Sequence, residues 1–394
     1  MKDEEVENLI HKEEKRQEEA VNLIASENYV SNDVRSALGS VLVNKYSEGY
    51  PAERYYAGNN VIDEVECLAQ HRALSLFSLA DEEWNVNVQP LSGTPANLAI
   101  YSALVPLGGK IMGMKLSHGG HLSHGHSISL TGKLWKQVPY GVSRESELLD
   151  YEEIGKQAEK EKPKIIVAGF TAYPRAVDFK AFRTIADSVG AYLVADISHI
   201  AGLIATGYHP SPFLYADVVM STTHKSLRGP RSALIFSRLG SGPSGSELAS
   251  KIDKAVFPGL QGGPHENQIA AVAVALREAA EPEFKKYIGE VLKNAKALAD
   301  ELGSLGWRLI SGGTDTHLLV VDVWMKGEGI GGKEASERLE KAGIIVNKNT
   351  IPFDERKPAD PSGIRLGTLA ETTRGKKEED MKEIARRIDT ILRS

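Results

Sequence analysis

Apolar residues recur along this chain with two periodicities, which predict alternating strands and helices. Short runs rich in aliphatic and β-branched residues predict strands at 110–114, 164–169, 191–196, 217–223 and 232–236. Helical spacing predicts a helix over 61–79 and another over 179–190, which ends at Gly190. Strand–helix–strand units of this kind form a largely parallel α/β sheet whose ligand crevice lies at the carboxyl ends of the strands.

The pattern changes after about Pro282. A Glu/Lys/Ala-rich helix is predicted over 283–304 and is followed by a strand at 317–323, a helix at 333–342, a strand-like run at 344–349 and a helix at 376–392. These elements indicate a second, smaller α+β unit. At the other end, the charged opening residues predict a mostly solvated helix that packs on a partner surface, and the Gly/Ser-rich run 237–247 predicts a surface loop.

Composition narrows the class of protein. The chain has 394 residues, 41% hydrophobic and 25% charged, with a net charge of −6, which is typical of a soluble globular protein and gives no reason to expect nucleic acid as a partner. No apolar run approaches a membrane span, and the first twenty residues resemble neither a signal nor a transit peptide. We therefore expect a cytoplasmic protein. The single cysteine, Cys67, excludes disulfide frameworks and cysteine-built metal sites, and we expect it to be a small buried hydrophobe.

The segment 221–232 carries the strongest chemical signal. Lys225 follows an apolar strand and is surrounded by hydroxyls, His224 and two arginines, Arg228 and Arg231. Desolvation and neighbouring cations lower the pKa of a lysine, as Schiff-base chemistry requires, and hydroxyls with arginine can hold a phosphate. A solvated lysine in a basic loop is the alternative.

Other segments allow similar pairs of interpretations. Asp196 ends a predicted buried strand and could pair with a pyridinium nitrogen or merely cap a loop. Ser92, Gly93 and Thr94 precede a predicted helix whose N-terminus could hold a phosphate, as could any helix start. Glu48 is either a desolvated general acid or base, or an exposed loop carboxylate.

Three further strings leave alternatives open. The histidines of 116–126 could ligate a metal, stack on an aromatic cofactor or simply lie in a loop; the absence of a nearby carboxylate or cysteine argues against the metal. The run 257–264 could present backbone N–H groups to an anion or form a tight turn. Arg365 could bind a substrate carboxylate or lie on the surface.

Taken in order, these strings resemble the serine hydroxymethyltransferase family over nearly the whole chain. The resemblance rests on LIASEN (23–28), NKYSEGYP (44–51), RYY (54–56), NVQPLSG (87–93), HGGHLSHG (118–125), AYLVAD (191–196), TTHKSLRGPR (222–231), AVFPGLQGGP (255–264) and NKNT (347–350). It implies the α/β fold of the aspartate-aminotransferase-like pyridoxal-phosphate enzymes. It also implies an N-terminal arm on the partner subunit (1–50), a large cofactor-binding domain (51–280) and a small C-terminal domain (281–394).

The resemblance also implies roles around pyridoxal phosphate. Lys225 would carry the cofactor as a Schiff base, Asp196 would pair with its ring nitrogen, His121 would stack on the ring and His199 would lie near its phenolic oxygen. The phosphate and the remaining cofactor contacts would come from Ser92, Gly93, Thr94, Thr171, Thr222 and Arg231, with Tyr46 and Gly263 of a neighbouring subunit.

On the substrate side, Arg365 would bind the amino-acid carboxylate with Ser26 and His224. Glu48, lent by the neighbour, would transfer protons, and Tyr56 would lie beside it. The tetrahydrofolate contacts implied by the resemblance are Leu116, Gly120, Leu122 and Asn349.

The implied reaction converts serine and tetrahydrofolate reversibly into glycine and methylene-tetrahydrofolate. The implied assembly is a homodimer or tetramer with shared active sites and no metal. A folate-independent aldolase of β-hydroxy amino acids is the alternative enzyme, and the folate-side residues argue against it.

Overall fold

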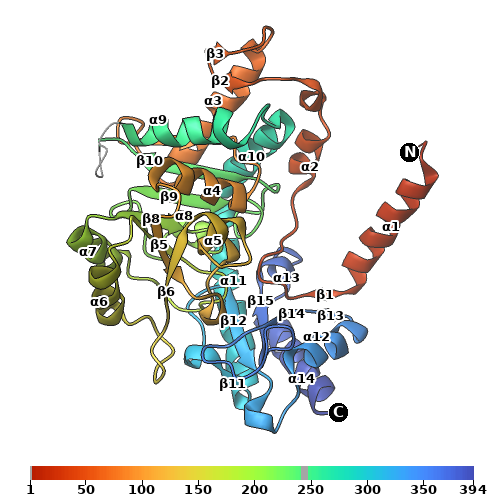
Figure 1. Cartoon of the computed structure of the whole chain (residues 1–394). Coiled ribbons are helices and arrows are strands. Elements are labelled where there is room, and N and C mark those ends of the chain that lie inside the picture. Colours follow the sequence, from red (N-terminus) through yellow and green to blue (C-terminus); the bar gives the residue numbers. More distant parts are fainter. Residues whose placement is uncertain (1, 241–246) are drawn as a thin grey trace.

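The computed structural model describes residues 2–240 and 247–394 (Figure 1). Its helices are α1 (Glu4–Glu19), α2 (Asn32–Leu38), α3 (Asn60–Leu76), α4 (Gly93–Leu104), α5 (Leu130–Leu134), α6 (Tyr151–Glu161), α7 (Phe179–Val189), α8 (Ala201–Ala205), α9 (Glu247–Lys254), α10 (Glu266–Ala279), α11 (Pro282–Ser304), α12 (Gly332–Lys341), α13 (Leu369–Thr373) and α14 (Glu378–Arg393). Its strands are β1 (Val21–Asn22), β2 (Gly49–Tyr50), β3 (Glu53–Arg54), β4 (Trp84–Asn87), β5 (Lys110–Met114), β6 (Lys136–Tyr140), β7 (Ile165–Gly169), β8 (Tyr192–Asp196), β9 (Val218–Thr222), β10 (Ala233–Arg238), β11 (Arg308–Leu309), β12 (Leu318–Asp322), β13 (Ile344–Ile345), β14 (Asn347–Asn349) and β15 (Gly363–Gly367).

A seven-stranded sheet in the order β4-β10-β9-β8-β7-β5-β6 forms the centre of the larger unit. Its strands are parallel except for β10, which runs antiparallel to both neighbours. Successive residues of one strand enter different cores: Ile166 faces a core built with α3, α6, α7 and α10, and Ile165 faces a core built with α4 and α9. Because helices cover both faces, these strands are apolar throughout, which is why short apolar runs predicted them.

A four-stranded antiparallel sheet in the order β11-β12-β15-β14 forms the smaller unit, with its own core against α11, α12 and α14. α11 joins the two cores, since Phe284 and Ile288 pack in the large one and Leu298 and Leu302 in the small one. The chain near the N-terminus also belongs to this side: β1 pairs in parallel with β13, and Leu23 is buried in the small core.

α1 projects from the body of the molecule (Figure 1). None of its residues is buried, and Val6, Leu9 and Ile10 are exposed. This matches the solvated helix that the charge pattern predicts. No helix within residues 2–240 and 247–394 is long and apolar enough to cross a membrane.

The predicted strands at 110–114, 164–169, 191–196, 217–223 and 232–236 are present as β5 and β7–β10, with ends shifted by at most two residues. The predicted helices are present as well, and α7 ends at Gly190 in the left-handed conformation, with φ +65°. Of the predicted surface loop 237–247, the first two residues belong to β10 and Glu247 begins α9, while residues 241–246 lie outside the described part of the chain.

One expectation was wrong. Cys67 is exposed rather than buried. α3 buries Ile62, Glu66, Ala69 and Ala73 on one face, and Cys67 lies on another face of the same helix. Residue type alone therefore did not reveal which face of this helix is covered.

Candidate active site

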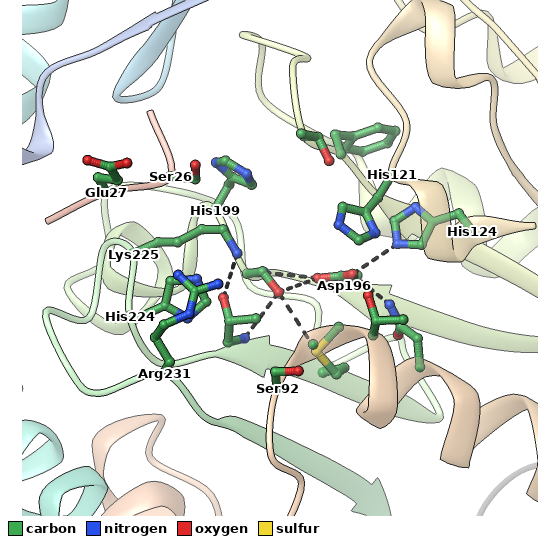
Figure 2. A pocket seen from close by; sticks show the side chains of 18 of the residues that line it. Ser26, Glu27, Ser92, His121, His124, Asp196, His199, His224, Lys225 and Arg231 are labelled. Atoms are coloured by element: carbon green, nitrogen blue, oxygen red, sulfur yellow. Dashed lines mark hydrogen bonds and ion pairs between the residues drawn. The ribbon is translucent and has the colours of Figure 1, made fainter. Parts of the chain in front are cut away.

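A cleft of about 310 Å³ lies at the carboxyl ends of β7, β8 and β9. This is the edge at which a doubly wound sheet binds its ligand. The cleft is lined by Ser26, Glu27, Ser92, Gly93, Thr94, Asn97, His121, His124, Phe170, Thr171, Asp196, Ser198, His199, Met220, Thr222, His224, Lys225, Arg231 and Arg365. Figure 2 shows Lys225 entering from one side and His121 and His124 from the other, with Asp196 between them.

Lys225 lies on the loop by which β9 turns back into antiparallel β10. Its Nζ donates a 2.8 Å hydrogen bond to Thr222 Oγ1, and its backbone oxygen accepts one of 3.0 Å from Asn28 Nδ2. Burial lowers the pKa of Lys225 to about 8, as do the positive charges of Arg365 and Arg231, although Asp196 opposes them. A buried amine of this kind is suited to nucleophilic chemistry near neutral pH.

Asp196 is the last residue of β8 and the most extensively hydrogen-bonded carboxylate of the cleft. Its Oδ2 pairs with His124 Nε2 at 2.9 Å and accepts from Asn97 Nδ2 at 3.1 Å. Its Oδ1 accepts from Ser198 Oγ at 2.6 Å and from Ser198 N at 3.1 Å. Burial alone would raise the pKa of Asp196, but these partners outweigh it and hold that pKa well below its usual range, so the carboxylate stays ionised.

Space for this carboxylate depends on Gly169, which lies opposite Asp196 in the register of β7 and β8. A Cβ atom at Gly169 would lie 2.5 Å from the Cβ atom of Asp196. A larger residue at this position would therefore displace Asp196.

His121 is held as a neutral ring beside Asp196 and His124. Its Nδ1 accepts a 3.1 Å hydrogen bond from Ser123 N and lies 2.7 Å from Ser123 Oγ. Burial, together with the charge of His124, lowers the pKa of His121 to about 4. A neutral flat ring at this place can stack on a planar ligand.

His199 is held by a second histidine that the sequence did not point to. The rings of His199 and His317 stack with centroids 5.5 Å apart, their Nδ1 and Nε2 atoms lie 3.4 Å apart, and His317 Nε2 is 3.1 Å from the Ala25 oxygen. Burial lowers the pKa of His317 to about 3 and that of His199 well below its ordinary value. Both rings are therefore neutral under physiological conditions.

The start of α4 forms the opposite end of the cleft. The predicted helix begins at Gly93, with Ser92 as its N-cap, and the Ser92 side chain makes no capping hydrogen bond. A Cβ atom at Gly93 would lie 2.8 Å from Thr222 Cγ2, so only glycine lets α4 approach β9 this closely. Hydroxyls of Ser92 and Thr94 at a helix N-terminus are suited to holding a phosphate.

Arg365, on the central strand β15 of the small sheet, reaches the cleft of the large unit. Its Nη1 donates to the Thr171 oxygen at 2.8 Å and its Nε to Asn347 Oδ1 at 3.0 Å. Both partners are neutral, and no ion pair to Arg365 is found among the described residues. Burial lowers the pKa of Arg365 to about 10, so it remains a cation that a substrate carboxylate would neutralise.

Four predicted site residues form a separate cluster that does not line this cleft. Tyr46 and Tyr56 pack edge to face with centroids 5.1 Å apart, and Tyr46 OH donates to Glu48 Oε1 at 3.3 Å. A Cβ atom at Gly263 would lie 3.2 Å from Tyr46 Cζ, which places Gly263 against the same ring. The structure therefore brings Tyr46, Glu48, Tyr56 and Gly263 together, but apart from the cleft-lining residues of the same chain.

The residues implied for folate lie near the cleft but not on its lining. Leu116, Gly120 and Leu122 belong to the loop after β5, which consists of short helical turns, and Asn349 ends β14, next to the strand of Arg365. A Cβ atom at Gly120 would lie 2.1 Å from the Met114 oxygen, so this turn requires glycine.

Several cleft residues escaped the sequence analysis. His124 was considered as a metal ligand, a stacking ring or a loop histidine, whereas it pairs with Asp196. Ser198 could have been found from its spacing two residues after Asp196, but no local signal reveals Asn97, nor His317 behind His199. Within the described residues no group of three or more His, Cys, Asp or Glu side chains is arranged to hold a metal ion.

These groups fit a flat, phosphorylated heteroaromatic aldehyde. The cleft presents a buried amine, an ionised carboxylate, a glycine-lined helix N-terminus and a neutral histidine ring, while His224 Nδ1 is buried without a partner. Fold and cleft together define a pyridoxal-phosphate enzyme of fold type I.

Comparison with known proteins gives the family. The family model described as serine hydroxymethyltransferase matches residues 1–388. A protein of Desulfotalea psychrophila (strain LSv54 / DSM 12343) named serine hydroxymethyltransferase is 52% identical over 390 residues, covering 99% of this chain and 88% of the relative. The chain belongs to the serine hydroxymethyltransferase family.

Family membership confirms the fold class and the activity that the resemblance implied. The chain is a pyridoxal-phosphate-dependent transferase that interconverts serine and glycine with tetrahydrofolate as co-substrate. The folate-independent aldolase is not favoured.

Proposed function

We propose that this chain transfers the hydroxymethyl carbon of serine to tetrahydrofolate in the cleft around Lys225. The observation that carries the proposal is that Lys225, Asp196 and Arg365 line one cavity with their charged groups buried, although they come from the loop after β9, the end of β8 and the middle of β15. When bound there, pyridoxal phosphate withdraws electrons from the bonds at the α carbon of the amino acid.

Lys225 supplies the amine that holds the cofactor. Because its pKa is lowered to about 8, about a tenth of Lys225 is neutral at pH 7, and the neutral Nζ can attack a carbonyl carbon. Thr222 Oγ1, 2.8 Å away, orients that nitrogen.

Asp196, His121, His199 and the start of α4 hold the rest of the cofactor. The ionised Asp196 keeps a proton on a ring nitrogen placed against it, and the neutral His121 leaves its ring face free for stacking. Phosphate oxygens would be held by Ser92, Gly93 and Thr94 at the helix N-terminus. The remaining cofactor contacts would come from Thr171, Thr222 and Arg231.

Arg365 binds the carboxylate of serine or glycine, assisted by Ser26 and His224. Its tie to the Thr171 oxygen fixes the guanidinium across the junction of the two units. A carboxylate placed here would neutralise a buried cation, which gives the site a strong preference for amino acids.

The cluster of Tyr46, Glu48, Tyr56 and Gly263 acts on a second copy of the chain. These groups do not line the cleft of their own chain, and the residues Tyr46 and Tyr56 are 54% and 43% exposed. In a homodimer, Glu48 would move protons on the substrate, Tyr56 would lie beside it, and Tyr46 and Gly263 would approach the phosphate. Leu116, Gly120, Leu122 and Asn349 would contact the folate.

The same proposal covers domains and location. Residues 1–50 form the arm, 51–280 the large domain and 281–394 the small domain. The two sheets with their separate cores support the division between the last two, while Leu23 of the arm is buried in the small core. The exposed free thiol of Cys67 supports a reducing, cytoplasmic location.

The test is Lys225→Ala, with Lys156→Ala on the exposed face of α6 as the matched control. We expect serine turnover to fall by more than about a thousandfold, because the nucleophilic amine is lost. Before any amino acid is added, the visible absorbance of the bound cofactor should differ from that of the unmodified enzyme, because Lys225 no longer joins it. The control should behave like the unmodified enzyme. Retained turnover in Lys225→Ala would refute the site.

A further inference from the structure

The connection between β6 and α6 is a hairpin that spans the junction of the two units. It is closed by an antiparallel bridge between Val142 and Leu149, and it extends beside the small sheet (Figure 1). Glu147 on this hairpin pairs with Arg308 Nη1 of β11 at 2.9 Å and accepts from Ser311 N at 2.7 Å. The hairpin of the large unit is thus bound to the small unit.

A second contact of the same hairpin involves an aromatic ring of the small unit. The Arg144 guanidinium carbon lies 4.2 Å from the centroid of the Phe353 ring. His118 packs edge to face with the same ring, with centroids 4.6 Å apart. Phe353 therefore contacts two side chains of the large unit.

His118 is itself held firmly. Its Nδ1 accepts a 3.2 Å hydrogen bond from Val142 N of the hairpin, and a Cβ atom at Gly141 would lie 2.5 Å from that nitrogen. Burial, with Lys115 and Arg144 nearby, lowers the pKa of His118 to about 4. The ring is neutral at physiological pH and forms a fixed wall for Phe353.

The position of this contact connects it to the co-substrate. His118 belongs to the loop that carries Leu116, Gly120 and Leu122, and Phe353 follows Asn349 by four residues. Asp354 ties this small-unit segment together, since its Oδ2 accepts from Ile351 N at 3.2 Å and from Ser362 N at 3.0 Å. The two halves of the proposed folate site therefore meet at the Phe353 ring.

We propose that Phe353, which contacts both His118 and Arg144, is a positioning residue that fixes Asn349 against the loop 116–122 and so sets the affinity for the folate co-substrate. This inference rests on the proposed function. The amino-acid half of the site does not depend on it, because Arg365 has its own bond to Thr171.

The experiment compares the holoenzyme with Phe353→Ala, Phe353→Tyr and Arg144→Gln. Two quantities are measured: KM for tetrahydrofolate, and Kd for glycine from the visible absorbance of the cofactor without folate. For Phe353→Ala we expect the tetrahydrofolate KM to rise about tenfold, the factor that loss of one aromatic pair and one cation–π contact supports. Arg144→Gln should raise it about threefold. The Kd for glycine should stay within about twofold of the unmodified value. Phe353→Tyr, which keeps the ring, should have the tetrahydrofolate KM of the unmodified enzyme.

Arg144 is exposed, so its replacement tests the contact even if Phe353→Ala does not fold. Glu145→Gln, an exposed neighbour on the same hairpin, is the matched control and should leave both quantities unchanged. An unchanged tetrahydrofolate KM in Phe353→Ala and Arg144→Gln would overturn the inference, as would a parallel loss of glycine binding, which indicates a merely structural role. Absence of tetrahydrofolate-dependent turnover in the unmodified enzyme would instead contradict the proposed function.

Discussion

Asp196 and Glu48 are two carboxylates proposed to serve one reaction, and their surroundings differ sharply. Asp196 is buried, accepts hydrogen bonds from Asn97 and Ser198, and is paired with His124. Glu48 is only partly buried and accepts a 3.3 Å hydrogen bond from the hydroxyl of Tyr46, a residue that is 54% exposed. Asp196 is held by hydrogen bonds from residues of the large unit. Glu48 instead lies on a segment with tyrosines that are exposed to solvent.

The contrast shows that the two kinds of site residue are placed differently in this fold. Groups that must keep one protonation state in a fixed place, such as Asp196 and His121, are buried among the strands and helices of one chain. Groups proposed to act on the substrate of a second copy, such as Glu48, are carried on a partly exposed segment. A buried site needs its polar partners built in, because an unpaired buried charge is costly.

The largest effect should come from the built-in carboxylate. We expect Asp196→Asn to lower turnover about a hundred- to a thousandfold, because the amide cannot stabilise a protonated ring nitrogen. The measurement is steady-state serine turnover at saturating cofactor.

Asp217→Asn is the matched control for this variant. Asp217 is also buried, and its Oδ2 accepts from Arg183 Nη1 and Leu193 N at 2.8 Å, but it does not line the cleft. It should lower the free energy of unfolding while leaving turnover per folded enzyme unchanged. Equal losses of turnover in both variants would contradict a specific role of Asp196 in the reaction.

Glu48 tests the other side of the comparison through mixed dimers. Glu48→Gln alone should reduce folate-dependent turnover about a hundredfold while cofactor binding is retained. Lys225→Ala should be inactive for a different reason, because it lacks the amine that holds the cofactor. Refolding the two variants together should restore about a quarter of the unmodified activity, since half the dimers are mixed and each has one site with both intact groups.

This recovery distinguishes shared sites from sites made within one chain. If Lys225 and Glu48 of the same chain served one site, every site in the mixture would lack one of them and no activity would return. Mixing Lys225→Ala with itself under identical conditions gives the background.

The smallest effect concerns the support beneath the Glu48 segment. Glu266, at the start of α10, is buried and accepts a 2.5 Å hydrogen bond from Ser47 Oγ. Burial raises the pKa of Glu266 from 4.5 to about 7, with Glu66 and Asp63 adding to the rise and Ser47 and Arg54 opposing it. The folded chain therefore binds this proton more tightly than the unfolded chain does.

The sign of the pH dependence follows. The stability that Glu266 contributes is complete below pH 4.5 and is lost as the pH rises through about 7. Relative to Glu266→Gln, the unmodified enzyme should lose free energy of unfolding between about pH 5 and about pH 8, measured by urea unfolding at constant protein concentration. Glu53→Gln, exposed on the same segment, should show no such difference. A difference between the enzyme and Glu266→Gln that does not change with pH would contradict the assignment.

The sequence by itself predicted five of the seven strands of the large sheet, the longer helices α1, α3, α11 and α14, and the residue types proposed for the cofactor site. Strands buried on both faces are short apolar runs, and Lys225, Asp196 and the Ser92–Thr94 string each adjoin the end or start of such an element. Reactive residues at the ends of strands and helices can be found from the sequence, because the chain passes there from a buried apolar run to a polar turn.

Only the tertiary structure decided which of these groups meet. The pairing of His124 with Asp196, the stacking of His317 on His199 and the packing of Phe353 against His118 and Arg144 join residues 72 to 235 positions apart. The exposure of Cys67 likewise depended on which face of α3 its neighbours cover. Such contacts are set by the order of strands in the sheet and the docking of two units, and local propensity does not encode either.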